Sequence, residues 1–512
     1  MLFKKLEELV EAFWTSPSFA YPYAPNLSMD SQENMLLTQR HIDAVRDIPE
    51  KMIHNLKESG FYMGGKWRNG KGYYIGKGIE DDGNVLVVGT NGSGKSRTIA
   101  KSAIETWSEP FVALDIKGEL SQHYESLLRE GRVKRKYIIF DPLFGEVSYE
   151  PFLLLKRDEI NLEQHVREIV YAIIPMPPND LDSYWITMAR DLLTAVLIYG
   201  HSIGLDFIET TIMAAYKSVP KLCRMIIKSD NSLAKAFITK IIGLKSEQQA
   251  SIGTDMMQHL MVFATDSCIQ NALSNDQNKK TFSWEDISVA DDIPNVFLRL
   301  SQDRLEQWNG VIRLMITQLV RTLERRPDKH SQQGCKTSPI LLLLDEFPLL
   351  GNMDVIKSAL TTLRSKKVTF CLMLQSIAQL DAVYGKNVRQ IIVDNCQYKI
   401  LLNITEPDSQ EYFSRLIGNG LVEKRSFSQS YNPSTGCITY GQQIQATREP
   451  WIFPHEFATN SDIVLHTPYG WFRTCKCPIS RMYDANNTHT QTLRFNIESV
   501  DISSIVRRLY DC

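Results

Sequence analysis

Short apolar runs alternate with longer stretches of helical periodicity over most of the chain. Apolar runs that end in a polar residue or a glycine occupy residues 84–89, 111–115, 136–141, 339–345, 368–375 and 398–405. Such runs, separated by helical stretches, are typical of strands in a parallel sheet that is covered on both faces. The pattern predicts an α/β fold built on this kind of sheet.

A long helical interval interrupts that alternation. Between about Leu155 and Asp286 most segments have helical periodicity and few resemble strands. We interpret residues 155–286 as an all-α domain inserted into the α/β domain. The α/β domain would then consist of a first part, residues 61–154, and a second part, residues 287–512, that includes C-terminal strands.

The first 60 residues differ from the rest and are predicted to form an N-terminal helical appendage. Apolar residues between Leu2 and Phe13 recur at helical spacing, prolines break the chain at residues 17–25, and a second helical pattern runs from Ser31 to Ile48. The polar face of the first helix carries both signs of charge. We therefore expect it to dock on the protein's own surface or on a partner subunit rather than on a membrane.

Glycine-separated strand segments follow from Phe61 to Gly89. The stretch from Gly64 to Gly78 mixes four basic residues with Trp67, Tyr73 and Tyr74. That composition could contact nucleic acid through phosphates and stacking, but a plain surface hairpin explains it as well and is the interpretation we favour.

Composition and charge narrow the class of protein. The 512 residues are 43% hydrophobic and 23% charged, with a net charge of −2, so no overall positive field attracts nucleic acid and any DNA contact must be local. No apolar run approaches the roughly 20 residues of a membrane span. We therefore predict a cytoplasmic protein without a transmembrane segment.

Cysteine usage favours a reducing compartment. Nine cysteines, an odd number, are spread through apolar segments, and Cys475 and Cys477 form the only close pair. These two have no second pair of ligands nearby, as a zinc site requires, so both are predicted to be strand residues.

One strand leads into a phosphate-binding loop. After the strand Asn84–Gly89, the sequence GTNGSGKS matches GxxxxGK[ST] and opens a helix that begins at Arg97. Glycines let backbone N–H groups surround an oxyanion, and the helix N-terminus adds its positive dipole. We expect Lys95 to reach the β- and γ-phosphates and Ser96 to ligate Mg²⁺. The predicted nucleotide-binding residues are Gly89, Thr90, Asn91, Gly92, Ser93, Gly94, Lys95, Ser96 and Arg97.

Two acids follow a later buried strand. Ile340–Leu344 is entirely apolar and is followed by Asp345 and Glu346. An apolar run that ends in two acids is weak evidence alone, because acids also cap helices. Beside a phosphate-binding loop, Asp345 is predicted to hold the Mg²⁺ shell and Glu346 to act as general base on the attacking water. The chain is therefore predicted to be an ATPase with ATP and Mg²⁺ as ligands.

Gln375 and Arg364 are further candidates. Gln375 ends the strand after Asp345, where a polar side chain could meet the γ-phosphate, although an amide that caps the following helix is the alternative. Arg364 on its own indicates only a solvated charge at a helix end.

Several strings, taken in order, resemble the VirD4/TraG family of type IV coupling proteins, within the FtsK/HerA class of ring-shaped DNA pumps. They are GTNGSGKS, LDIKGEL (114–120), YEPF (149–152), YWITMAR (184–190), LLDEFPLLG (343–351) and QSIAQLDAVYG (375–385). The last two are specific to the family. Within LDIKGEL, Asp115, Lys117 and Glu119 have either a family role or a local structural one.

The resemblance implies a RecA-like α/β domain with an all-α domain, assembled as a homo-hexamer around a channel. Arg364 matches the arginine finger that reaches a neighbour's nucleotide, and Gln375 matches the sensor. The implied function is to recruit DNA, single- or double-stranded and sequence-independent, with its relaxase, or an effector protein, to a type IV secretion apparatus. ATP hydrolysis would drive the transfer.

One departure concerns attachment to the membrane. Members of this family usually carry N-terminal transmembrane helices, which this sequence does not show. We expect a peripheral location at the cytoplasmic face of the inner membrane. Two alternatives stay open: a soluble DNA translocase without a secretion partner, and a nucleotide-dependent substrate receptor with little turnover.

Overall fold

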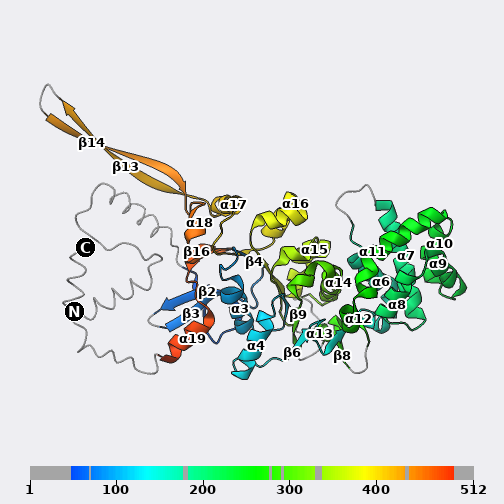
Figure 1. The fold of residues 1–512 in the computed structure, drawn as a ribbon. Helices are drawn as coiled ribbons and strands as arrows, with labels where there is room; N and C mark the ends of the chain where they lie inside the picture. The colour runs from blue at the N-terminus through cyan, green and yellow to red at the C-terminus, as the bar shows by residue number, and fades with distance from the viewer. Residues whose placement is uncertain are drawn as a thin grey trace.

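A sheet of nine strands organises the part of the chain that the structure describes (Figure 1). The computed structural model describes residues 48–68, 71–176, 183–275, 279–289, 293–328, 337–432 and 437–488. The two predicted N-terminal helices, apart from Ile48, lie outside these residues.

The strand order is β16-β15-β12-β4-β11-β10-β5-β9-β6. The seven strands from β12 to β6 are parallel, and β15 and β16 add an antiparallel edge. Their bounds are β4 Val85–Val88, β5 Phe111–Asp115, β6 Tyr137–Phe140, β9 Asn295–Arg299, β10 Ile340–Leu344, β11 Val368–Leu374, β12 Tyr398–Leu401, β15 Ile463–Thr467 and β16 Gly470–Thr474. All six predicted strands are present, whereas β9 was not predicted because its apolar core of three residues is short.

Hydrophobic clusters cover both faces of the sheet. Along β4, Leu86 and Val88 belong to one buried cluster, and Val85 and Val87 belong to the other. Successive side chains of a strand point to opposite faces, so an uninterrupted apolar strand fills two cores at once. This explains why the strands read as continuous apolar runs.

Different elements cover the two faces. One face packs against α3 (Lys101–Thr106), α4 (Glu119–Arg129) and a three-stranded sheet. That small sheet contains β1 (Ile53–Asn55), β2 (Gly60–Arg68) and β3 (Lys71–Gly78), with α19 (Ile479–Thr488) against β3. The other face carries α14 (Leu305–Glu324), α15 (Asp354–Thr362), α16 (Ile377–Asp394) and α17 (Pro407–Ile417).

The helical interval forms a separate layer at the right of Figure 1. The chain enters and leaves it through β7 (Val147–Tyr149) and β8 (Lys280–Phe282), which pair in parallel. The helices between them are α5 Leu153–Arg157, α6 Leu162–Ile173, α7 Ser183–Ser202, α8 Phe207–Tyr216, α9 Val219–Lys228, α10 Ser232–Ile242, α11 Ser246–Thr265 and α12 Ser267–Leu273, and α13 Trp284–Val289 follows. The domain boundaries at residues 60, 154 and 286 stay a prediction.

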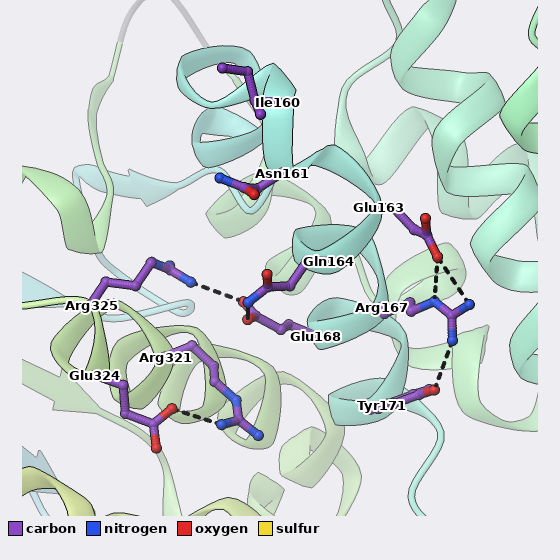
Figure 2. A pocket seen from close by; sticks show the side chains of 10 residues that line it. All are labelled: Ile160, Asn161, Glu163, Gln164, Arg167, Glu168, Tyr171, Arg321, Glu324 and Arg325. Atoms are coloured by element: carbon purple, nitrogen blue, oxygen red, sulfur yellow. Dashed lines mark hydrogen bonds and ion pairs between the residues drawn. The ribbon is translucent and has the colours of Figure 1, made fainter.

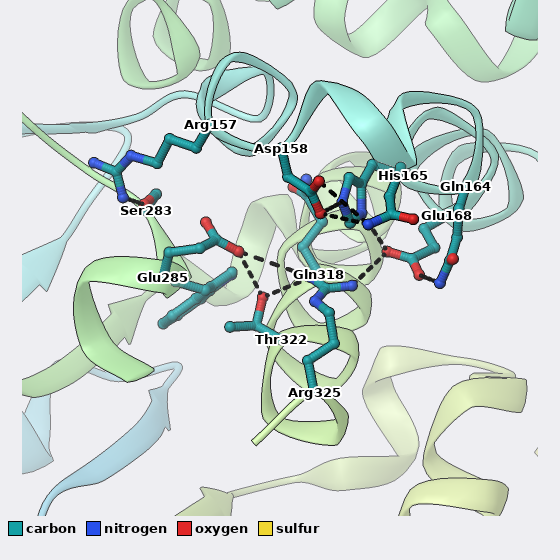
Figure 3. Close-up of polar contacts among 12 residues, drawn as sticks. Arg157, Asp158, Gln164, His165, Glu168, Ser283, Glu285, Gln318, Thr322 and Arg325 are labelled. Atoms are coloured by element: carbon teal, nitrogen blue, oxygen red, sulfur yellow. Dashed lines mark hydrogen bonds and ion pairs between the residues drawn. The ribbon is translucent and has the colours of Figure 1, made fainter. Parts of the chain in front are cut away.

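A polar network joins this helical layer to α14 (Figure 3). Arg325 at the end of α14 donates to Glu168 of α6 over 3.3 Å and lies 3.8 Å from Glu285 of α13. His165, on the same helix as Glu168, contacts Asp158 over 2.9 Å. Beside these contacts lies an open groove of about 620 Å³ between α6 and α14, in which Arg167, Arg321 and Arg325 each face an acid of their own (Figure 2).

An antiparallel ribbon projects from the body at the upper left of Figure 1. It consists of β13 (Asn419–Asn432) and β14 (Cys437–Pro450), which pair with each other and with no other described strand. This ribbon is not among the predicted strands, because residues 419–450 contain no continuous apolar run.

The basic and aromatic stretch from Gly64 to Gly78 is the β2–β3 hairpin. Tyr74 and Lys77 are fully buried, and the Lys77 ammonium donates to Thr369 Oγ1 over 3.1 Å. The exposed Arg68 is paired with Glu50. The hairpin interpretation therefore fits better than a stacking surface for nucleic acid, since Tyr74 and Lys77 lie inside the protein.

Candidate active site

The loop between β4 and the next helix curls back on itself at the carboxyl edge of the sheet. Gly92 and Gly94 adopt positive φ angles of 75° and 95°, which glycine tolerates without strain. The loop is fixed to neighbouring strands, because Gly89 N–H donates to Leu374 over 3.2 Å and Thr90 N–H donates to Asn403 over 2.8 Å. The helix that follows, η2 (Lys95–Ala100), runs on into α3.

Lys95 lies under this loop. Its ammonium donates to the carbonyls of Gly89 at 2.6 Å and Thr90 at 3.3 Å, and only 5% of the residue is exposed. Burial lowers the pKa of Lys95, and the nearby Glu346 and Asp345 oppose that shift. An ammonium that is poorly solvated and close to the loop is well placed for an anion.

Ser96 meets the first of the two acids. Its hydroxyl donates to Asp345 Oδ2 over 2.9 Å, and the other oxygen of Asp345 accepts the N–H of Glu346 at 3.0 Å. Burial raises the pKa of Asp345, a shift that the Ser96 hydroxyl partly offsets. A hydroxyl and a carboxylate side by side are the oxygen ligands that Mg²⁺ takes when phosphate and water supply the rest. These residues therefore fit the predicted metal.

Glu346 has an unusual backbone. Its φ of 52° is in the left-handed region, which among the described non-glycine residues only Lys367 shares. Such a conformation costs about 1–3 kcal/mol and is common at functional sites. Gln375 at the end of β11 donates its amide to Glu346 Oε2 over 3.3 Å, so its side chain faces the acid rather than capping α16.

The two strings that carry the family resemblance pack against each other. The ring of Phe347 stacks on that of Tyr384, with centroids 5.7 Å apart. The Tyr384 hydroxyl donates to the Gly351 carbonyl over 3.1 Å. These contacts hold the turn after Glu346 (η6, Phe347–Leu350) against α16.

Arg364 lies away from this site within its own chain. It belongs to η7 (Leu363–Lys366), which precedes β11, whereas Gln375 follows that strand. Arg364 is half exposed and lies 3.5 Å from Asp82, which precedes β4. Because both residues lie at the amino ends of parallel strands, Arg364 is at the opposite edge of the sheet from Lys95.

The residues of LDIKGEL divide into structural and peripheral positions. Asp115 is buried and accepts bonds from the N–H groups of Leu120 and Ser121 at 3.2 and 2.8 Å, so it caps α4. Glu119 pairs with Lys101 over 3.2 Å. The charge of Lys117 is close enough to lower the pKa of Lys95. Asp115 therefore has the local structural role.

Two polar residues at this site were not predicted. Asn403 follows β12, and its backbone carbonyl accepts both the N–H and the hydroxyl of Thr90, at 2.8 and 3.1 Å. Lys476 reaches over the loop from the segment after β16, and its ammonium donates to Asn403 Oδ1 over 3.0 Å. Asn403 could have been predicted, since it ends an apolar strand as Gln375 does; Lys476 follows an edge hairpin that gave no such signal.

The cysteine pair is only partly as predicted. Cys475 exchanges two backbone hydrogen bonds with Gly65, at 2.9 and 3.1 Å, whereas Cys477 lies in the loop beyond and is not a strand residue. Over the described ranges, no group of three or more His, Cys, Asp or Glu side chains is placed to hold a metal. Nor does any helix of those ranges have the length and apolar character needed to cross a membrane.

A comparison with protein families matches residues 27–466 to the family described as Type IV secretory system Conjugative DNA transfer. The conjugal transfer protein TraG of Rhizobium radiobacter is 23% identical over 388 residues, which is 72% of this chain and 57% of that protein. Protein VirD4 of Agrobacterium fabrum is 24% identical over 393 residues, 74% of this chain and 56% of that protein. The chain thus spans little more than half the length of these relatives.

Solved structures with a similar fold include those of the plasmid coupling protein TrwB. The complex of TrwB with the ATP analogue ADPNP aligns with a TM-score of 0.62 at 16% identity and covers 90% of this chain and 96% of that one. An unbound form of TrwB aligns with a TM-score of 0.60 at 18% identity, covering 77% and 84%. The predicted fold class, a RecA-like sheet with a helical domain, is thereby confirmed for the described residues.

Proposed function

Because the chain belongs to the type IV secretory system conjugative DNA transfer family, we propose that it is an ATPase that drives DNA or a protein substrate into a secretion apparatus. The resemblance to type IV coupling proteins is confirmed by this membership. The observation that carries the proposal is the contact between Ser96 and Asp345, because it brings the loop and the acids together at one edge of the sheet.

In the proposed reaction, these side chains divide the work of hydrolysis among them. Glu346 takes a proton from a water molecule, whose oxygen attacks the γ-phosphorus of ATP, while the bond from that phosphorus to the β–γ bridging oxygen breaks and ADP leaves. Lys95 and the loop N–H groups hold the oxygens on which negative charge develops. Gln375 orients Glu346 and the water through its amide. Ser96 and the shell around Asp345 would hold Mg²⁺, which would neutralise part of the phosphate charge.

The choice of ligand has support from a fold relative. TrwB has been solved with ADPNP, with the GTP analogue GDPNP, and with ADP and Mg²⁺. A nucleoside triphosphate with Mg²⁺ is accordingly the proposed ligand here, with ATP as the substrate.

In addition to Lys95, we expect a second cation, supplied by a neighbouring subunit, to stabilise the developing γ-phosphate charge. Arg364 lies at the edge of the sheet opposite Lys95, and its side chain is half exposed. A residue that contacts the nucleotide of a neighbouring subunit must be exposed in this way. We infer a ring of six copies, with each Arg364 reaching its neighbour's nucleotide. This arrangement makes hydrolysis depend on assembly.

The transported substrate is DNA, bound by its backbone without sequence preference, with an attached relaxase, or an effector protein. Binding would then weaken as salt rises. The protein would work at the cytoplasmic face of the inner membrane, attached to the secretion apparatus.

The decisive experiment uses Lys95→Ala in a strain that carries both this protein and a type IV secretion apparatus. We expect ATPase activity and transfer to be lost together while the protein level is unchanged. A Lys95→Ala variant that transfers normally would instead support a receptor that needs little turnover. DNA-stimulated ATPase activity with no transfer defect in a deletion strain would support a free translocase.

A further inference from the structure

Two thiols lie at the ends of a tight turn beside the phosphate-binding loop. The N–H of Cys477 donates to the carbonyl of Cys475 over 3.0 Å, which closes a three-residue turn around Lys476. Even in a fully extended chain, the first and last Cα of three residues are at most about 7 Å apart, and a turn shortens that distance. The two Cα atoms are therefore within the separation of up to about 6.8 Å that a disulfide can bridge.

The thiols of this turn also contact each other. The Cys475 side chain forms a hydrogen bond with the Cys477 side chain, and Cys475 is exposed whereas Cys477 is half-buried. That hydrogen bond and the positive charge of the nearby Arg481 lower the pKa of the Cys477 thiol, although burial partly opposes them. Because the thiolate is the form that reacts with oxidants, Cys477 is the more reactive of the pair, and a second thiol is next to it.

Both ends of the turn are fixed to β2. Cys475 exchanges two backbone hydrogen bonds with Gly65, and the Tyr62 hydroxyl donates to the Cys477 carbonyl. A Cβ on Gly65 would lie 3.5 Å from the Cβ of Cys477, so the turn also packs closely on the strand. Because its ends are held, a change in the distance between the two sulfurs must be taken up by the middle residue, Lys476.

Lys476 extends from the turn to the phosphate-binding loop. Its ammonium donates to Asn403 Oδ1 over 3.0 Å, and its Cε lies 3.0 Å from the position that a Cβ on Gly94 would take. The backbone carbonyl of Asn403 in turn accepts two hydrogen bonds from Thr90 of the loop. The state of the two thiols can therefore reach the loop through one side chain.

We propose that Cys475 and Cys477 form an oxidation site, at which a peroxide joins them as a disulfide and thereby weakens nucleotide binding by the loop. The second part rests on the proposed binding of nucleotide there. An S–S bond of about 2.05 Å draws the two sulfurs much closer than a contact between thiols, so Lys476 is withdrawn from Asn403. In a reducing compartment such disulfides are transient and act mainly as redox signals.

The reaction consumes one peroxide and two thiols. The Cys477 thiolate attacks one oxygen of hydrogen peroxide, the O–O bond breaks, and the leaving hydroxide takes up a proton to become water. The Cys475 sulfur then attacks the sulfenic acid on Cys477, and its proton leaves with the displaced hydroxyl group as a second water. Both sulfurs are oxidised and the peroxide is reduced to two waters. A thiol reductant reverses the step.

The position of Lys476 between the thiols allows a direct test of the disulfide. The full chain is treated with hydrogen peroxide, the remaining thiols are alkylated, and trypsin is added. Trypsin cuts after Arg473, Lys476 and Arg481, so the reduced chain gives separate peptides 474–476 and 477–481. We expect the oxidised chain to give one joined species, lighter than the sum of the two thiol peptides by two hydrogen atoms. Separate peptides after oxidation would overturn the proposal.

The effect on the loop is measured as the dissociation constant of ATP with Mg²⁺. Oxidation of the parent chain should raise this constant about 3- to 10-fold, as expected for the loss of one hydrogen bond from a partly exposed ammonium, and dithiothreitol should restore it. Cys475→Ser and Cys477→Ser should bind ATP normally and should not lose affinity with peroxide. Cys268→Ser removes a half-buried thiol on α12 and is the matched control, which should respond as the parent does.

Lys476→Met tests the route from the thiols to the loop. This variant should weaken ATP binding in the reduced chain about as much as oxidation weakens it in the parent, with no further loss after peroxide. A disulfide that forms while ATP affinity stays unchanged would overturn the link to the loop, as would a further loss in Lys476→Met. A reduced parent chain that binds no ATP but still gives the joined peptides would overturn the proposed function and leave the oxidation site standing.

Discussion

The hydroxyl of Ser96 and the carboxylate of Asp345 are 2.9 Å apart although 249 positions separate them in the chain. The contact exists because β4 and β10 are both parallel to β11, which lies between them, so their carboxyl ends meet at one edge. Asp345 is thereby held in place by the loop that binds phosphate.

Replacing Asp345 by asparagine should remove the metal-dependent part of catalysis. Asp345→Asn keeps the shape of the side chain and its bond to Ser96 but loses the negative charge that attracts Mg²⁺. We expect the ATPase rate at saturating ATP to fall about 100-fold or more, as loss of several kcal/mol of charge stabilisation requires. A titration of activity with Mg²⁺ is the measurement, and a variant with the normal Mg²⁺ curve would contradict the assignment.

Glu346 and Gln375 should behave as one unit. Glu346→Gln is expected to retain ATP binding and to lose about 100-fold or more in kcat, because the general base is gone. Gln375→Ala alone should lower kcat about tenfold, because the Gln375 amide no longer holds Glu346 Oε2. In a chain that already carries Glu346→Gln, the same substitution should lower kcat less than twofold, because there is no general base left to position. Additive effects of the two substitutions would refute this coupling.

Mixed assemblies test the position of Arg364. A mixture of Arg364→Ala and Glu346→Gln subunits should recover activity that neither has alone, because some interfaces then combine an intact finger with an intact base. The finger is expected to be worth about 1000-fold. Lys367→Ala is the control, since Lys367 pairs with Glu80 near Arg364. No recovery at any mixing ratio would show that Arg364 does not act between subunits.

The pH dependence of stability should include a contribution from His466 on β15. Burial and the adjacent Lys399 lower the pKa of His466 to about 4 in the folded chain, against an ordinary value of 6.5. Between these values the unfolded chain binds more protons, so stability falls as the pH drops from 6.5 towards 4, by up to about 3 kcal/mol. Urea unfolding should show that His466→Phe removes this fall, whereas His455→Gln, at an exposed position, should keep it.

The sequence was sufficient for the parts of the site that lie at strand ends. Lys95, Ser96, Asp345 and Gln375 follow apolar strands, and in a parallel sheet covered by helices this places them at a common edge. Their mutual contacts follow from that one rule.

Other parts depend on tertiary placement that no local pattern records. Lys476 reaches the loop only because β15 and β16 add an antiparallel edge beside β12. A hairpin of five-residue strands is hard to predict, because so short a strand leaves only a weak hydrophobic pattern in the sequence. The ribbon of β13 and β14 contains no continuous apolar run. The role of Asp115 was open from the sequence, since an acid after a strand serves equally as a helix cap or as a ligand, and only the contacts with Leu120 and Ser121 decide it.

The position of β4 between β11 and β12 has a consequence for synthesis of the protein on the ribosome. At about 5–20 residues per second, roughly 15–60 s pass between translation of residue 88 and residue 401. Until residues 368–374 of β11 have been made, β4 has neither of its neighbouring strands, and it lacks β12 until residue 401. Ribosome-bound chains stalled before residue 368 should thus be cut rapidly by protease around residues 85–96. Chains stalled well beyond residue 474 should resist cleavage there. Equal cleavage of both sets of chains would disprove the delay in pairing.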